Sequence, residues 1–176
     1  MSRLMKLVPN GMAGFMAAIF LDSLRYKFTD HPKTQVIFDA LDDWAGSLGA
    51  PGLFGHTGLF SQYVIGSIEL LAATLLIAGM SPRRGHLQAA GALAGLLVMS
   101  GAVSFHLFTP LGTDPNHDGG GLFVAACLNL AFAILLLGIF RRREFATFAS
   151  RVVAIFAATP AVDAERAAAP IVAAPA

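Results

Sequence analysis

Four long runs of apolar residues constrain what this chain can fold into more than any other feature of its sequence. The runs cover residues 11–28, 61–79, 87–108 and 121–140. Each contains about 18–22 residues, which at a helical rise of ~1.5 Å per residue matches a hydrocarbon core ~30 Å thick. Hydrophobic residues make up 56% of the chain and charged residues 13%, below the roughly 25% of soluble domains. We therefore expect an all-α protein, built as a four-helix transmembrane bundle.

The first run is a weaker candidate for a span than the others, because charged residues lie in its last third. Arg3 and Lys6 precede it, so the start of the chain resembles a signal peptide. No cleavage site of small residues separates this run from a soluble domain. We therefore expect it to be a retained first span.

The distribution of Lys and Arg predicts the orientation of the spans, since cytoplasmic segments carry an excess of both. With four spans, the N-terminus, the second connection and the C-terminus share one side. We expect that side to be the cytoplasm of a bacterial-type inner (plasma) membrane, with residues 29–60 and 109–120 outside. The basic residues of the cytoplasmic side are Arg3, Lys6, Arg83, Arg84, Arg141, Arg142, Arg143 and Arg151.

The segments outside the four runs contain two further helical patterns. Ile37, Leu41 and Trp44 recur at helical spacing, which predicts a short amphipathic helix on the outer leaflet, anchored by the only tryptophan. A second pattern follows the last run, and an Ala/Pro-rich tail after it is expected to be disordered. The predicted parts of the chain are a four-span domain at 1–144, an interfacial helix at 145–158 and the tail at 159–176.

Polar residues inside the runs gather toward the predicted outer end, above an inner half that is nearly pure Leu, Ile, Ala and Phe. An ionisable side chain in a span costs roughly 2.5–3.5 kcal/mol on insertion scales and usually faces the protein interior. One reading is a structural network, in which Arg25 or Lys27 neutralises a carboxylate. A second reading is a pocket open to the outside for a quinone headgroup, a small polar ligand or a proton. A third is a contact with a partner subunit. The candidate residues are Glu69, Asn129, Ser100, Asp22, Arg25 and Lys27.

Histidines near the outer end raise the question of a metal site. His106 ends the third run, and His56, His117 and Asp118 lie in the outer connections. Imidazole and carboxylate groups suit Zn or Cu, but no pair here has a tight spacing such as HxxxH. We expect no metal site, and instead a hydrogen-bonded His106 that caps the third run, with Asp118 capping a turn or the next helix.

Other function classes are excluded by what the chain lacks. Cys127 is the only cysteine, which rules out an internal disulfide and a CxxC redox pair. The net charge of +1 provides no basic field for nucleic acid. A redox role would therefore require a bound quinone or a partner protein.

Three segments carry a combination of motifs that occurs in one family. They read SLRYKFTDHPKTQVIFDAL, IGSIELLAATLLI and LLVMSGAVSFHLFTPLGTDPNHDGGGLFVAAC, within residues 11–140. The combination resembles the DoxX-like family of small four-helix integral membrane proteins. The matching positions are Lys27, Phe28, Glu69, His106, Asp118, Gly119 and Gly120.

The resemblance implies a bundle in the inner membrane and says little about activity. The family is named for its likeness to the small membrane subunit of a thiosulfate:quinone oxidoreductase. We therefore expect an accessory or quinone-associated subunit of a membrane redox system, not an enzyme on its own. Its expected partners are the lipid bilayer and a redox or respiratory membrane complex. Alternatives are a small transporter component that uses Glu69, and a scaffold subunit of a larger membrane complex.

Overall fold

The computed structural model describes the backbone of residues 3–168 and the side-chain surroundings of residues 7–155. The described part consists of helices joined by loops and turns and contains no strand, which confirms the all-α prediction. The helices are α1 (Arg3–Lys27), α2 (Pro32–Ser47), α3 (Gln62–Ala78), α4 (Gly85–Phe108), α5 (Gly121–Leu135), the π-helical segment η1 (Leu136–Phe140) and α6 (Arg142–Ala168).

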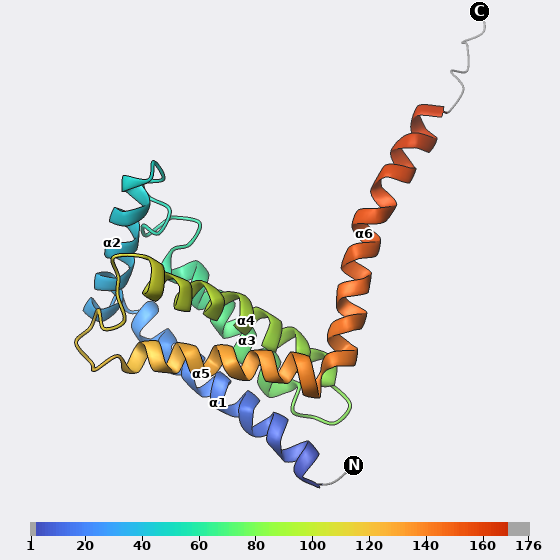
Figure 1. The fold of residues 1–176 in the computed structure, drawn as a ribbon, viewed down its shortest axis with the longest axis horizontal. Helices are drawn as coiled ribbons and strands as arrows, with labels where there is room; N and C mark the ends of the chain where they lie inside the picture. Colours follow the sequence, from blue (N-terminus) through green and yellow to red (C-terminus); the bar gives the residue numbers. More distant parts are fainter. Residues whose placement is uncertain (1–2, 169–176) are drawn as a thin grey trace, which may run out of the picture.

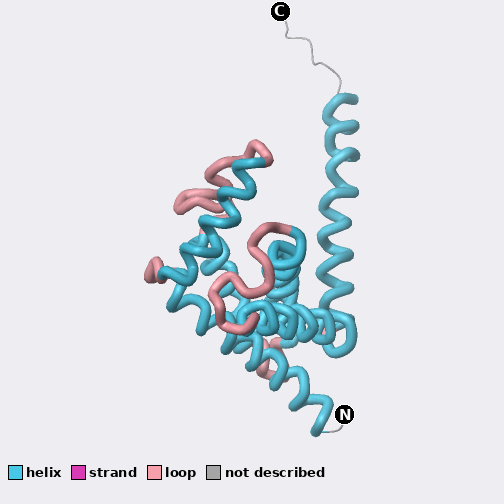
Figure 2. The backbone as a smooth tube through the Cα atoms, turned by 60° about the vertical axis from the view of Figure 1, so that its left-hand side comes forward, coloured by secondary structure: helices cyan, strands magenta, loops and turns pink. Residues whose placement is uncertain are grey.

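Four of these helices pack alongside one another as a bundle. α3 contacts both α1 and α4, while α5 contacts both α4 and α1. Figure 1 shows α2 at one end of this bundle and α6 leaving the opposite end. We call the first the cap end, where Figure 2 shows the longer loops beside α2, and the second the junction end, where α5 passes through η1 into α6.

Three helices are long and apolar enough to cross a membrane: Leu7–Lys27, Gly85–Phe108 and Gly121–Phe140. About a third or less of the residues in the apolar stretch of each helix are buried inside the protein (28–33%), so most of these residues keep some exposed surface. Apolar surface of this extent is suited to lipid and not to water. The chain is therefore a membrane protein by its helices. The second predicted run forms α3, which is also apolar but has 17 residues.

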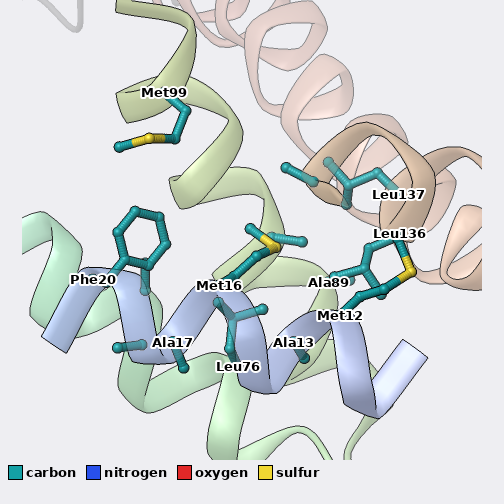
Figure 3. Packing of buried hydrophobic residues seen from close by; sticks show 14 of the residues in the cluster. Met12, Ala13, Met16, Ala17, Phe20, Leu76, Ala89, Met99, Leu136 and Leu137 are labelled. Carbon is teal, nitrogen blue, oxygen red and sulfur yellow. The ribbon is translucent and has the colours of Figure 1, made fainter. Parts of the chain in front are cut away.

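The core of the bundle combines small residues with a few large ones. Met16 and Phe20 of α1 are almost fully buried against α4, as Figure 3 shows. Gly91 of α4 lies so close to α3 that a Cβ there would be 2.8 Å from the carbonyl oxygen of Ala72. Such close approach of backbones is how membrane helices gain packing contacts where lipid supplies no hydrophobic drive.

The loop helix α2 packs on protein at the cap end. Its Leu41 and Ala45 are buried in a second apolar cluster together with Phe54 and Leu111. Trp44, which was predicted to anchor this helix in lipid, packs edge-on against Phe105 of α4 with 6.2 Å between ring centroids. The amphipathic helix is where the sequence predicted it, but its tryptophan contacts the bundle.

Asp42 fixes the loop that follows α2. Its carboxylate accepts hydrogen bonds from the backbone N–H groups of Gly52 (3.2 Å), Phe54 (2.9 Å) and Gly55 (3.1 Å). These bonds hold Phe54 where it enters the cluster with Leu41. The cap therefore has a defined conformation and covers the end of the bundle.

The junction end contains a buried polar chain that the sequence did not predict. Gln88 of α4 is fully buried; it donates to Asn10 Oδ1 (3.1 Å) and accepts from Arg141 Nε (2.7 Å). Asn10 in turn donates to the backbone carbonyl of Met80 (3.2 Å). The prediction that the inner half is nearly pure apolar is therefore wrong at this end. The polar groups of α1, α4 and the residue between η1 and α6 satisfy one another, which makes their burial tolerable.

The C-terminal boundary also differs from the expected one. A helix was predicted at 145–158 with a disordered tail from 159, whereas α6 runs without a break from Arg142 to Ala168. Alanine is the best helix former, so the Ala-rich sequence beyond residue 158 prolongs the helix. Residues 169–176 of the predicted tail lie outside the described residues.

Candidate functional site

A cavity of about 630 Å³ lies at the cap end, between α1, α3, α4 and α5 and beneath α2. Its walls are mostly apolar, and its volume is in the range of sites that bind small organic ligands. Several lining residues are also surface-exposed, Leu97 and Phe60 among them, so the cavity opens to the surroundings. The polar residues of its lining are Asp22, Ser23, Tyr26, Lys27, Lys33, Thr34, Glu69, His106, Asn116 and Asp118.

Lys27 and Glu69 form a buried ion pair in this lining. Lys27 Nζ lies 2.9 Å from Glu69 Oε2, and the two side chains are 16% and 4% exposed. Ser23 donates to the same carboxylate oxygen over 2.5 Å and accepts from Lys27 Nζ over 3.1 Å. A buried pair is tolerated only when further hydrogen bonds satisfy its atoms, and Ser23 provides them here.

Helical spacing explains how the two partners meet. Ser23 and Lys27 are four residues apart, so they lie on one face of α1. Opposite them on α3, an ideal Cβ at Gly66 would lie 3.5 Å from the Lys27 side chain, an ordinary van der Waals contact, so the two helices are in direct contact beside the pair. The prediction that Lys27 or Arg25 neutralises a carboxylate is confirmed. Ser23 was missed, although its i, i+4 spacing from Lys27 was a signal in the sequence.

Asp22 and Arg25 form a separate pair at the surface. Arg25 Nη2 lies 3.0 Å from Asp22 Oδ1, with side chains 65% and 57% exposed respectively. Exposed pairs of this kind contribute about 0–1 kcal/mol to stability. Asp22 still borders the cavity, whereas Arg25 does not line it and stacks on Tyr26 instead.

His106 is buried at the end of α4 and also lines the cavity. Its Nδ1 lies 2.6 Å from the backbone carbonyl oxygen of Gly112. Its ring packs in a T-shaped arrangement with the ring of Phe123, with 5.5 Å between the ring centroids. Because a carbonyl only accepts, Nδ1 carries the proton in the neutral ring and Nε2 is left as an acceptor. The structure confirms the hydrogen-bonded His106 that was predicted at the end of this run.

Asp118 caps α5. Its carboxylate accepts from the backbone N–H groups of Gly121 (3.0 Å) and Leu122 (3.3 Å), in the first turn of the helix. Gly119 and Gly120 between them have positive φ angles of 74° and 78°, which favour glycine. The predicted capping role is confirmed, and the cap places Asp118 at the rim of the cavity.

Two predicted members of the polar layer do not join the cavity. Ser100 is exposed on the outside of α4. Asn129 of α5 is fully buried, yet neither its amide nitrogen nor its oxygen has a hydrogen-bond partner among the described residues. A hydrogen bond between these two residues is therefore absent from the described part of the structure.

The two other histidines that were considered as metal ligands, His56 and His117, do not line the cavity. His56 is 58% exposed and lies near Tyr63 (3.1 Å) and Asp30 (3.7 Å), on the loop between α2 and α3. His117 is exposed in the turn before α5. Among the residues that the structure describes, no group of three or more His, Cys, Asp or Glu side chains is placed to hold a metal ion.

Comparisons with protein-family models, with characterised proteins and with solved structures find no match to this chain. The DoxX-like resemblance therefore stays a prediction from the sequence motifs. What the site can do follows from its own geometry: an apolar cavity with one charged, hydrogen-bonding wall and an imidazole acceptor suits a small amphipathic ligand.

Proposed function

We propose that the chain is a four-span protein of a bacterial-type inner membrane, with both termini in the cytoplasm. In support, α3 is apolar and packs between α1 and α4. Its 17 residues extend ~25 Å at 1.5 Å per residue, close to the hydrocarbon thickness. The basic residues cluster in the segments that this topology leaves on the cytoplasmic side.

We further propose that the chain is a DoxX-like accessory subunit of a membrane redox system and binds a quinone in the cavity at the cap end. The observation that supports this most directly is the cavity of about 630 Å³, whose apolar walls carry Lys27, Glu69 and His106. A quinone has a flat apolar ring, two polar oxygens and an apolar tail. Such a molecule needs a mostly apolar cavity with a few polar groups, and a route from the lipid.

The packing of α1 against α5 supports a route from the lipid. Toward the junction end, the two helices meet at Phe15 and Phe132, whose ring centroids are 5.2 Å apart. One turn and more beyond this contact, Ile19 of α1 and Leu122 and Ala125 of α5 all border the cavity. Leu122 is 36% exposed. A tail would leave the cavity between these two helices.

The polar groups have distinct roles toward such a ligand. Lys27 would donate a hydrogen bond to a ring oxygen and give up the one that it donates to Ser23. The Ser23 hydroxyl would keep a partner, because it also lies 3.0 Å from the carbonyl oxygen of Phe20. Nε2 of His106 would accept a hydrogen bond, and with it a proton, from a ring hydroxyl. Glu69 holds Lys27 in place. Bound there, a quinone would supply the two-electron chemistry that no side chain of this protein provides, with a partner subunit exchanging the electrons.

The test is to purify the chain in mild detergent, extract the lipids and measure quinone per mole of protein. We expect a stoichiometric quinone that is lost in His106→Leu and retained in Ser100→Ala, because Ser100 lies outside the cavity. Membranes from a deletion strain should also lose electron-transfer activity that the wild-type gene restores. A purified protein without quinone, together with unchanged electron transfer after deletion, would overturn the proposal.

A further inference from the structure

The helix α6 extends away from the bundle and runs across the direction of the bundle helices. Figures 1 and 2 show it leaving the junction end at a steep angle to α5. Its start is attached to the bundle: the Arg141 N–H donates to the carbonyl of Leu136 (2.7 Å), and Arg141 Nε donates to the buried Gln88 (2.7 Å). The direction of α6 is therefore set by contacts with η1 and α4.

One face of α6 is apolar and begins on the bundle. Phe145, Phe148, Ala149 and Val152 are spaced three, four and seven residues from the first, so they share a face. Phe145 packs against the core of the bundle, which shows that this face is turned toward the bundle. Further along the same face, Phe148 is 50% exposed. The apolar face thus continues beyond the edge of the bundle, into the space beside it.

The other faces of α6 are polar and basic. Arg143, Thr147, Ser150 and Arg151 are exposed, and Arg142 is exposed at the start of the helix. The acid nearest to them, Glu144, lies 3.9 Å from Arg141 at the junction. The exposed surface of residues 142–151 is therefore positively charged.

We propose that α6 lies in the plane of the membrane surface at the junction end and binds anionic phospholipids. The spanning helices run along the long axis of the bundle, so the membrane plane lies across that axis. α6 also runs across that axis, so it can lie in the membrane plane. The face shared by Phe145 and Phe148 would enter the acyl chains beside the bundle. The arginines would pair with lipid phosphates, an attraction of about 1 kcal/mol per basic residue near an anionic surface. No α6 residue whose side chain the structure describes, residues 142–155, lines the cap-end cavity, so this inference does not depend on the quinone.

The experiment is fluorescence quenching by lipids with brominated acyl chains. In a Trp44→Phe background, the full chain carries one tryptophan, at Phe148→Trp or, as the control on the opposite face, at Thr147→Trp. Both variants are reconstituted into phosphatidylglycerol vesicles. We expect a several-fold larger loss of fluorescence for Phe148→Trp than for Thr147→Trp. Equal quenching of the two positions, or none at either, would overturn the proposal; Val152→Trp replaces Phe148→Trp should that variant not fold.

The basic face has its own test. Arg143→Gln combined with Arg151→Gln should reduce the quenching at position 148 in phosphatidylglycerol vesicles and lessen its sensitivity to salt. Vesicles of zwitterionic phosphatidylcholine should give weaker quenching for the chain that retains both arginines. If lipid charge and arginine number make no difference, α6 does not recognise anionic lipid. In that case the proposal fails while the quinone content of the protein is unaffected.

Discussion

Lys27 and Glu69 join α1 to α3 through a buried ion pair, with Nζ 2.9 Å from Oε2 and 3.1 Å from Oε1. Ser23 completes the arrangement by donating to the same carboxylate. The pair has two consequences: it fixes how α1 and α3 face each other, and it places a charged group in the wall of an otherwise apolar cavity.

Breaking this pair should destabilise the bundle more than replacing both partners. Lys27→Met leaves a buried carboxylate without its cation and should cost about 3–5 kcal/mol, whereas Lys27→Met with Glu69→Met should recover most of that loss. Thermal unfolding in detergent measures both. Arg25→Met, which removes a cation from the exposed pair with Asp22, is the matched control and should cost about 0–1 kcal/mol. Equal costs for Lys27→Met and Arg25→Met would contradict the buried pair.

Filling the cavity should remove its ligand without disturbing the fold. Ala125 lines the cavity, and Ala131 is exposed elsewhere on the same helix. We expect Ala125→Trp to lose bound quinone and Ala131→Trp to keep it, with similar unfolding temperatures. Quinone content after lipid extraction is the measurement. Retention of quinone by Ala125→Trp would place the ligand outside this cavity.

Two fully buried amides should respond oppositely to replacement by leucine. Asn129 has no hydrogen-bond partner among the described residues, and an unsatisfied buried polar group costs about 1–3 kcal/mol. Asn129→Leu should therefore stabilise the protein by about 1 kcal/mol. Gln88→Leu should destabilise it by about 1–3 kcal/mol, because it leaves Asn10 and Arg141 without their partner. Unfolding temperatures decide this, and destabilisation by Asn129→Leu would mean that its amide is satisfied.

The corner between α1 and α2 should weaken in acid. The hydrogen bond from Tyr63 (2.6 Å), followed by one from Gln62 and the charge of His56, holds the pKa of Asp30 below its ordinary value of 3.8. A lowered pKa in the folded state contributes stability above that ordinary value, and this contribution is lost as the pH falls through the folded pKa. The protection of residues 28–34 against hydrogen exchange, relative to the intrinsic exchange rate at each pH, should therefore fall below about pH 4, and Asp30→Asn should abolish this dependence. Identical pH profiles for the two proteins would contradict it.

The positions of the long helices could be predicted because they depend on local composition. The expected run at 87–108 is the helix Gly85–Phe108, and the run at 121–140 is the continuous pair α5 and η1, Gly121–Phe140. The ends of these helices are also local, since Asp118 caps α5 from only three residues away. Hydropathy and turn residues are sufficient for such features.

The candidate site could be predicted only in part. The pairing of Lys27 with Glu69 and the hydrogen-bonded His106 follow from the cost of burying ionisable groups. The exposure of Ser100, the unpartnered Asn129 and the chain from Asn10 through Gln88 to Arg141 do not follow from that cost. Each depends on which side of a helix faces its neighbours.

The sequence by itself determined that the chain is helical, where its long helices lie and that they suit a membrane, because length and hydropathy belong to each segment alone. Only the tertiary structure decided which residues face inward, which residues line the cavity, and that Trp44 packs on Phe105. The physical reason is that lipid and protein interior are both apolar. A helix that is apolar all round, such as α5, carries no pattern that distinguishes its inner face from its outer one, and packing against its neighbours makes that distinction.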